Sequence, residues 1–314
     1  MGILTRKQHD LIKQVRHEQA KGMSLRWFFN KVSPGLDDRV EIYKLDEKNV
    51  PKSPRCADSQ NKLEGERYFS EAHLLFNRVL PKERDRKDER RRWIFDAGKG
   101  DVFFHVAVNV GGNVVGASIA TYAKKVNLAL FNLIAVDPEY RNQGVAKMLV
   151  KHRIWSADEA SKKAKKGGID YVGTEIARPD GKDADNIMRN KIRLEYHQKV
   201  SQVKAVLSPE NEVLGSTHYM FTIRQIGQEE LRTISARKYA KLIYWHYVDY
   251  TEWEKLGMTF SGGMDYLARV LNKIAWKGGI TGKMIEKEKT RVLERVPKNL
   301  ELEMVELSKL AIRG

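Results

Sequence analysis

NLIAVDPEYRNQGVAKMLV, residues 132–150, is the most informative part of this 314-residue sequence. It begins inside an apolar run over 128–136, and such a run bounded by turn residues is typical of a buried strand. The segment 137–140 has the proline and acidic residues of a turn. Apolar residues then recur at helical spacing from Val145. The stretch therefore predicts a strand, a tight loop and a helix in immediate succession.

The loop between this strand and this helix has the properties of an anion site. The first turn of a helix leaves backbone N–H groups without partners at the positive end of the helix dipole. Gly144 and Ala146 are small, so a bound group can approach the backbone closely. Neither GxxxxGK[ST] nor GxGxxG occurs in the sequence, so the two common phosphate loops are excluded. We expect a phosphate-binding loop of another type.

The loop RNQGVA fits the pattern [RQ]xxGx[GA], and it follows an apolar strand and the letters VDPEY. In this context it closely resembles motif A of the GNAT superfamily of acyl-CoA N-acyltransferases. The resemblance implies acetyl-CoA as cosubstrate, with its pyrophosphate on the loop amides and its pantetheine arm along the main chain of the preceding strand. The implied cofactor-binding residues are Ile134, Val136, Arg141, Asn142, Gln143, Gly144, Val145, Ala146 and Lys147.

The predicted order of elements agrees with the same family over residues 36–226. Strands are expected at 39–45, 102–110, 114–122, 128–136, 169–176 and 217–226, and helices at 66–97 (divided at Pro81), 145–164 and 185–200. The fold class is therefore α+β, with a GNAT-like, mostly antiparallel mixed sheet flanked by helices. The resemblance also implies that two parallel strands separate near motif A to admit the thioester.

Two further segments flank this domain. Residues 1–35 are predicted to form a basic N-terminal helix, and residues 227–314 a helical extension that stays helical to the end. Aromatic residues crowd the first part of the extension, and at helical spacing they favour a buried core over a binding platform. The sequence thus predicts an acetyl-CoA-binding domain at 36–226 between two helical additions.

The resemblance implies a general base on or near the strand before motif A. That strand reads LALFNLIAV and has no carboxylate, and its one polar side chain is Asn132, which can orient a water molecule. The nearest carboxylate on the following strand is Glu175. Glu175 is therefore the candidate base, with recognition of a cationic acceptor as its alternative role.

A general acid is implied in the helix after that strand, where the family has a pattern like FYxKxGF. The equivalent stretch here is YHQKVSQ, residues 196–202. Alignment on Lys199 favours His197 as the acid, whereas chemistry favours Tyr196. Neighbouring residues on a helix point about 100° apart, so only one of the two can face the leaving thiolate.

These patterns favour an N-acetyltransferase that moves an acetyl group from acetyl-CoA to a primary amine through a ternary complex. The acceptor is a small molecule, a protein or a nucleic-acid-linked amine. The alternative is a non-catalytic GNAT-fold protein that binds nucleic acid or a protein partner through its basic surface and helical extensions. A homo-oligomer assembled through the aromatic C-terminal segment is a further hypothesis.

Composition limits the other function classes. There are 57 Lys and Arg against 41 Asp and Glu, a formal net charge of +16 and a sequence pI near 9.7. This excess favours a polyanionic partner, an acidic substrate or solubility alone. Cys56 is the single cysteine, which excludes a disulfide framework and a cysteine-based zinc site, and no metal is expected. With no long apolar run and no signal segment, a membrane partner is not expected and the cytoplasm is the predicted location.

Overall fold

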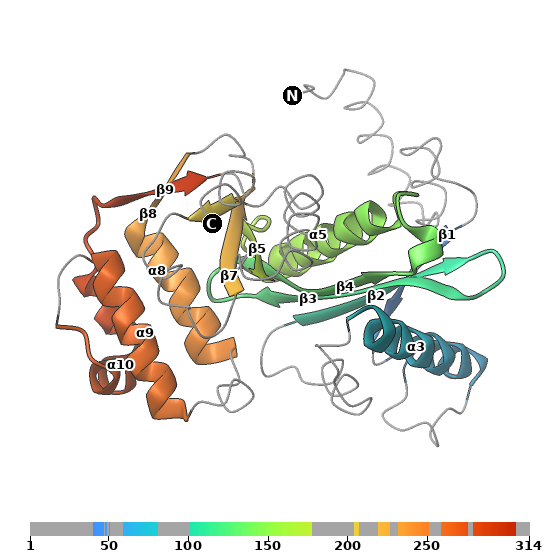
Figure 1. Ribbon diagram of the computed structural model, residues 1–314, viewed down its shortest axis with the longest axis horizontal. Coiled ribbons are helices and arrows are strands. Elements are labelled where there is room, and N and C mark those ends of the chain that lie inside the picture. Colours follow the sequence, from blue (N-terminus) through green and yellow to red (C-terminus); the bar gives the residue numbers. More distant parts are fainter. Residues whose placement is uncertain are drawn as a thin grey trace, which may run out of the picture.

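The structure is a computed structural model, which describes residues 40–46, 48, 50, 59–80, 101–177, 204–206, 219–226, 232–250, 259–275 and 279–305. The predicted helices at 1–35 and 185–200 lie outside these residues, as does the part of the predicted helical segment 66–97 that begins at Pro81. The predicted α+β class is confirmed, because the described strands form one mixed sheet with helices on its two faces (Figure 1).

The described strands form a nine-stranded sheet in the order β1-β2-β3-β4-β5-β7-β6-β9-β8. All neighbouring strands run antiparallel except β4 and β5, which are parallel. The strands are β1 (Val40–Leu45), β2 (Asp101–Asn109), β3 (Val114–Ala123), β4 (Leu128–Val136), β5 (Tyr171–Ala177), β6 (Lys204–Val206), β7 (Tyr219–Gln225), β8 (Thr233–Ser235) and β9 (Glu301–Val305).

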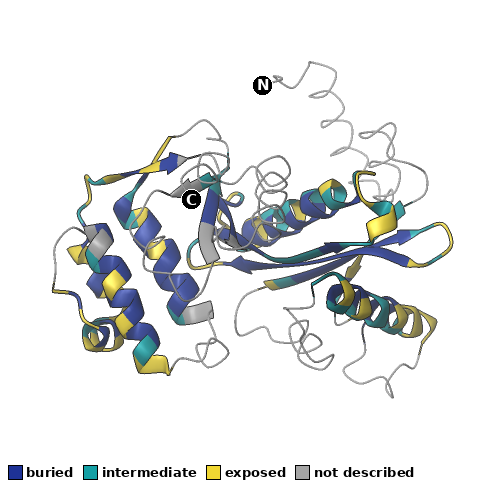
Figure 2. Ribbon diagram, viewed as in Figure 1, coloured by how far each residue is buried: buried dark blue, intermediate teal, exposed yellow. Residues whose placement is uncertain are grey.

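Strands β2, β3 and β4 are the centre of the molecule. Every residue of β3 is buried, because helices cover both faces of the sheet there (Figure 2). The turn between β2 and β3 uses Gly112 at a φ of +79°, a conformation that costs glycine little. The predicted strands at 102–110, 114–122 and 128–136 are confirmed to within a residue at each end.

Two helices cover opposite faces of this centre (Figure 1). Helix α3 (Gln60–Val79) packs aromatic and aliphatic side chains on β2 and β3, and α5 (Val145–Lys163) packs on the other face. Helix α3 begins before the predicted residue 66, because the Ser59 hydroxyl caps it by accepting from the Lys62 amide at 3.4 Å. It ends at Val79, two residues before Pro81, as proline disfavours a continuing helix.

The C-terminal helices pack on the sheet and share one core with it. They are α8 (Ala236–Tyr244), the π-helical turn η6 (Trp245–Tyr250), α9 (Phe260–Ala275), α10 (Gly282–Glu288) and the 3-10 helix η8 (Lys289–Arg295). Their apolar side chains join those of Leu128, Leu130 and Ile223 in a single cluster. Tyr239 and Tyr247 are buried in it, which confirms the predicted core role of these aromatic residues.

The prediction that residues 227–314 stay helical is wrong, because β8 and β9 lie in this segment. Strand β9 pairs with both β6 and β8, so it joins the C-terminal helices to the main sheet. Its sequence ELEMV alternates, with Leu302 and Met304 buried and Glu301 and Glu303 exposed, which is the signature of a half-buried strand. Strands β6 and β8 have three residues each, too few to show a period.

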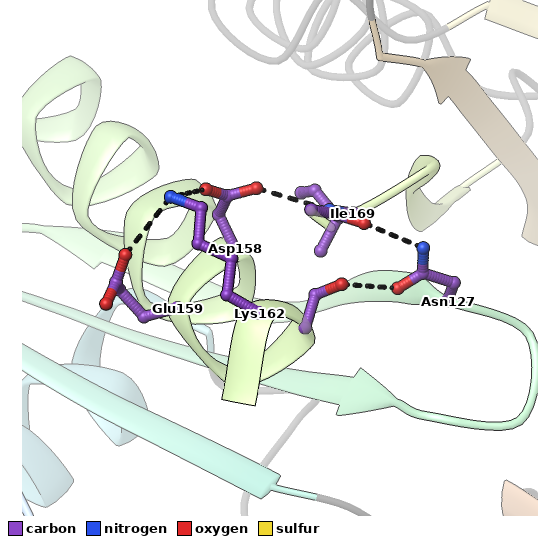
Figure 3. A network of polar contacts seen from close by, with 7 residues as sticks. Asn127, Asp158, Glu159, Lys162 and Ile169 are labelled. Atoms are coloured by element: carbon purple, nitrogen blue, oxygen red, sulfur yellow. Dashed lines mark hydrogen bonds and ion pairs between the residues drawn. The ribbon is translucent and has the colours of Figure 1, made fainter. Parts of the chain in front are cut away.

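Asn127 fixes the crossover from β4 through α5 to β5 (Figure 3). Its Oδ1 accepts hydrogen bonds from the hydroxyls of Tyr122 and Ser161, each at 2.8 Å, and its Nδ2 donates to the Gly168 carbonyl at 2.8 Å. Its own carbonyl accepts from the amide of Tyr171 at 3.3 Å. Its side chain thus links β3, the end of α5 and the loop before β5, and its carbonyl holds the start of β5.

A second contact closes the same crossover (Figure 3). Asp158 on α5 accepts from the Ile169 amide at 3.2 Å through Oδ1 and from Lys162 Nζ at 2.6 Å through Oδ2. Lys162 also contacts Glu159 at 3.2 Å. The acidic pair on α5 therefore holds both the loop that leads to β5 and a lysine of its own last turn.

Asn127→Ala should lower the free energy of unfolding by about 2–4 kcal/mol, because it leaves two buried hydroxyls without their acceptor. It also places alanine at a φ of +51°, where the side chain makes no hydrogen bond that would offset the backbone strain. Urea unfolding measures the change. Asn113→Ala, at an exposed turn position, is the control and should change stability by less than about 0.5 kcal/mol. Equal effects of the two substitutions would contradict the role of Asn127.

Candidate functional site

The parallel strands β4 and β5 separate half-way along β4. They pair through four positions, from Leu128 opposite Tyr171 to Phe131 opposite Thr174. Beyond this point β4 pairs only with β3, as far as Val136, and β5 pairs only with β7. The backbone edge of β4 over 132–136 is therefore not part of the ladder with β5. The separation that the family resemblance implied is present at this point.

A bulge lies at the same point. In the register with β3, Ile119 is opposite Leu133 and Ala120 is opposite Phe131, so Asn132 is the extra residue. An extra residue reverses which face the following side chains take. Before the bulge, the even-numbered Leu128 and Leu130 face the C-terminal helices. After it, the even-numbered Ile134 and Val136 pack against α5 on the opposite face.

Side chains from three elements hold the carbonyl groups around the separation. The Thr174 hydroxyl donates to the Phe131 carbonyl at 2.9 Å, and the Thr222 hydroxyl donates to the Thr174 carbonyl at 2.9 Å. The Arg153 guanidinium on α5 donates to the Leu133 carbonyl. On β4 the Asn132 Oδ1 accepts from the Thr121 hydroxyl at 3.3 Å. The end of the β4–β5 ladder is thus fixed by side chains.

The loop after β4 is a compact 3-10 turn. Asp137 caps it by accepting from the Glu139 amide at 3.1 Å, and Arg78 at the end of α3 binds the same carboxylate at 2.5 Å. Tyr140 accepts at its hydroxyl from Asn109 at 2.8 Å. The turn is therefore anchored to both α3 and β2, and it sets the position of the chain that enters α5.

Residues 142–147 lead the chain into α5 through two positions with positive φ. Asn142 has a φ of +62° and Gly144, the N-cap of α5, a φ of +82°. The first hydrogen bond of the helix runs from the Met148 amide to the Gly144 carbonyl at 3.0 Å. Within the described part of the chain, no hydrogen bond uses an amide of residues 142–147. Consecutive free amides at a helix start bind phosphate well.

The first turn of α5 approaches β3 very closely. A Cβ added to Gly116 would lie 2.8 Å from Val145 Cγ1 and 3.1 Å from Leu149 Cδ1, so only glycine fits there. Of the predicted cofactor-binding residues, Val145 is buried in this contact, whereas Arg141, Asn142, Gln143 and Lys147 are exposed around the helix start. The structure therefore brings this predicted set together at one end of α5.

The predicted catalytic residues are described only in part. Asn132 lies at the bulge. The backbone of Glu175 follows the last β4–β5 position and pairs with Phe221 of β7, while its side chain lies outside the description. Tyr196 and His197 lie outside the described residues.

Sequence reasoning missed a buried polar cluster between α5 and β2. His105 Nε2 lies 3.0 Å from the Ser156 Oγ, and its ring centroid lies 5.9 Å from that of His152. Arg153 lies beside them with its guanidinium carbon 5.0 Å from the centre of the Phe131 ring. Their signal was present, because His152, Arg153 and Ser156 recur with Leu149 on the apolar face of α5.

Burial holds both histidines neutral. The pKa of His152 falls from 6.5 to about 4, mainly through burial and then through Lys151. The pKa of His105 lies well below its ordinary value, mainly through burial and then through electrostatic interaction with His152, Arg153 and Lys44. Lys151, next to Lys147, also has a lowered pKa, through burial first. The cluster therefore contains two neutral imidazole rings and one cation, the Arg153 guanidinium.

Residues 100–178 match the family model described as an acetyltransferase (GNAT) domain. They form a GNAT domain. The match spans β2 to β5 with α5, and so it contains the separation of β4 and β5, the bulge and the open amides. The resemblance drawn from motif A is thereby confirmed for this segment.

Solved structures similar to the chain are acetyltransferases. A GNAT-family acetyltransferase from Staphylococcus aureus Mu50 has 14% identity and a TM-score of 0.38, over 60% of this chain and 99% of its own. An aminoglycoside 6′-N-acetyltransferase complexed with coenzyme A has 14% identity and a TM-score of 0.39, over 59% and 97%. PaiA N-acetyltransferase from Thermoplasma acidophilum, in complex with coenzyme A, has 14% identity and a TM-score of 0.36, over 59% of this chain and 98% of its own. No curated protein matches the chain.

Among the residues that the structure describes, no helix combines the length and the apolar character needed to cross a membrane. In the same part of the chain, no three His, Cys, Asp or Glu side chains gather as metal ligands would.

Acidification should destabilise the GNAT domain through His152. Because its pKa in the folded state lies below 6.5, the neutral ring favours folding fully above pH 6.5, and this contribution is lost as the pH falls towards 4. The loss is on the order of 3 kcal/mol. Urea unfolding between pH 7 and pH 4 measures it, and His152→Gln should flatten the profile. If the free energy of unfolding of the variant falls with pH as steeply as that of the wild type, other groups cause the pH dependence.

Proposed function

We propose that the protein is an N-acetyltransferase that transfers an acetyl group from acetyl-CoA to a primary amine. The observation that carries this proposal is the row of amides at residues 142–147, unused within the described residues, at the end of a strand whose edge has just left its parallel neighbour. The amides suit the pyrophosphate of the cosubstrate, and the open edge of β4 suits its extended arm. The GNAT domain match at 100–178 supports the same activity.

The proposed reaction needs few groups. The neutral amine attacks the acetyl carbonyl carbon, a C–N bond forms, and the negative charge moves to the oxygen. The C–S bond then breaks, and the thiolate of coenzyme A takes a proton while the amine loses one. We assign the base to Glu175, one residue beyond the last β4–β5 position, and the acid to Tyr196 or His197. Holding both substrates in line supplies much of the rate.

A second candidate function is binding of coenzyme A without transfer. It is favoured by β4, which carries no carboxylate from Leu128 to Val136, and by the departure of YHQKVSQ from the family pattern. The two functions differ in turnover but not in cosubstrate binding.

Gly144→Glu should abolish the binding of acetyl-CoA, because it puts an anion and a side chain where the pyrophosphate is expected. We expect at least a 100-fold weaker Kd, or about 2.7 kcal/mol, by isothermal titration. Gly167→Glu is the matched control, since Gly167 has the same φ of +82° at the other end of α5 and open space around it. Wild type that binds no acetyl-CoA while folded would overturn the proposal.

Glu175→Gln should lower kcat/KM by about 100-fold or more and leave the Kd of acetyl-CoA unchanged, because it removes a proton acceptor and keeps the shape. The measurement is release of free thiol from acetyl-CoA with a panel of primary amines. Thiol release by the wild type that survives the substitution would move the base elsewhere. Binding without any turnover across the panel would favour the second candidate function.

A further inference from the structure

We propose that Arg153 is a positioning residue for the acyl-carrying arm of the cosubstrate, because it holds the part of β4 that has left β5. This inference rests on the proposed function and extends it to a residue that motif A does not include. The loop amides are assigned to the nucleotide half of acetyl-CoA, whereas Arg153 is assigned to the half that carries the thioester.

The contacts of Arg153 place it at the separation of the strands. Its side chain is 2% exposed and extends from α5 across the Phe131 ring, with the guanidinium carbon 5.0 Å from the ring centre. One terminal nitrogen donates to the Leu133 carbonyl. Phe131 is the last residue of β4 opposite β5, and Leu133 is the first after the bulge. The guanidinium therefore spans the bulge on the side of α5.

A buried guanidinium is costly, so its retention calls for a reason. Arginine stays protonated in proteins, and removing its charge from water costs several kcal/mol before compensation. An apolar residue would continue the face formed by Leu149 and Ala157, which are both buried on α5. Only a long donor can reach a strand carbonyl that no longer lies in the ladder with β5. Holding that carbonyl fixes the peptide before Ile134, where the edge offered to the arm begins.

The surroundings keep this charge directed at β4. His105 and His152 lie beside it as neutral rings with lowered pKa values, and His105 is held by Ser156 at 3.0 Å. Lys44 of β1 and Lys151 of α5 are the cations that act on these histidines. At neutral pH the two histidines are thus uncharged, and the Arg153 guanidinium is the cation that binds the Leu133 carbonyl.

One helix therefore serves both halves of the ligand. The N-terminus of α5 offers amides at residues 142–147, and two turns later Arg153 holds the strand along which the arm would lie. The two contributions can be separated with 3′-phospho-ADP, which has the nucleotide half of coenzyme A and lacks the pantetheine arm.

The test is isothermal titration of acetyl-CoA and of 3′-phospho-ADP into wild type and Arg153→Met. We expect the Kd of acetyl-CoA to rise at least tenfold and the Kd of 3′-phospho-ADP to stay within twofold. Trp155→Leu is the matched control, because Trp155 lies on the exposed face of the same helix, away from the Arg153 cluster. It should leave both Kd values within twofold.

Other outcomes overturn the inference. An equal loss for both ligands would show that Arg153 only stabilises the fold, and no loss for either would show that the strand does not need it. Wild type that binds neither ligand would overturn the proposed function together with the inference. Wild type that binds both, with an insensitive Arg153→Met, would overturn the inference alone.

A measurement on the wild type covers the case in which Arg153→Met does not fold. In ¹⁵N-labelled protein, acetyl-CoA should shift the Nε–H resonance of Arg153, and 3′-phospho-ADP should not. Arg153→Lys identifies the resonance by its loss and keeps the charge. A resonance that ignores acetyl-CoA, in protein shown by titration to bind it, would overturn the inference.

Discussion

The short parallel pairing of β4 and β5 is the constraint on which the rest of the site depends. Parallel strands need a crossover, here supplied by α5, and α5 can only lie where the two ends of that crossover allow. Asn127 fixes one end through bonds to β3, α5 and the loop before β5. Thr174 fixes the last position of the β4–β5 ladder through its bond to the Phe131 carbonyl. The parallel pairing is four positions long, and beyond Phe131 and Thr174 the two strands no longer pair with each other.

The bulge and the helix start act together on this opening. Asn132 shifts the alternation of β4 so that Ile134 and Val136 face α5, while Gly116 lets the first turn of α5 descend onto β3. The open strand edge and the open amides therefore lie on adjoining segments, joined by a turn that Asp137 and Tyr140 anchor. The groups that we propose for two different parts of the ligand therefore come from sixteen consecutive residues, 132–147.

The sequence predicted the central strands and α5 closely, because each has a clear hydrophobic period and a turn residue at its end. Motif A predicted where the amides lie because its glycine, Gly144, takes a φ of +82° at the start of the helix. The strands of three residues and the pairing of β9 with β6 were missed, since a short segment has no period and its partner lies about 100 residues away. His105 was missed because its contact with α5 depends on the packing of that helix on β2, which no local pattern encodes, whereas Arg153 does recur at helical spacing on the buried face of α5.

The place of β9 in the sheet has a consequence for biosynthesis. Strand β6 at 204–206 has β7 on one side and β9 on the other, so one edge of it stays bare until residues 304–305 have left the ribosome. A bare strand edge is a template for pairing with other chains. Domains begin to fold during synthesis, at about 5–20 residues per second, so this edge is exposed for some seconds in every nascent chain. Of the described strands, the last to be made is thus the one that shields the sheet from its neighbours on the polysome.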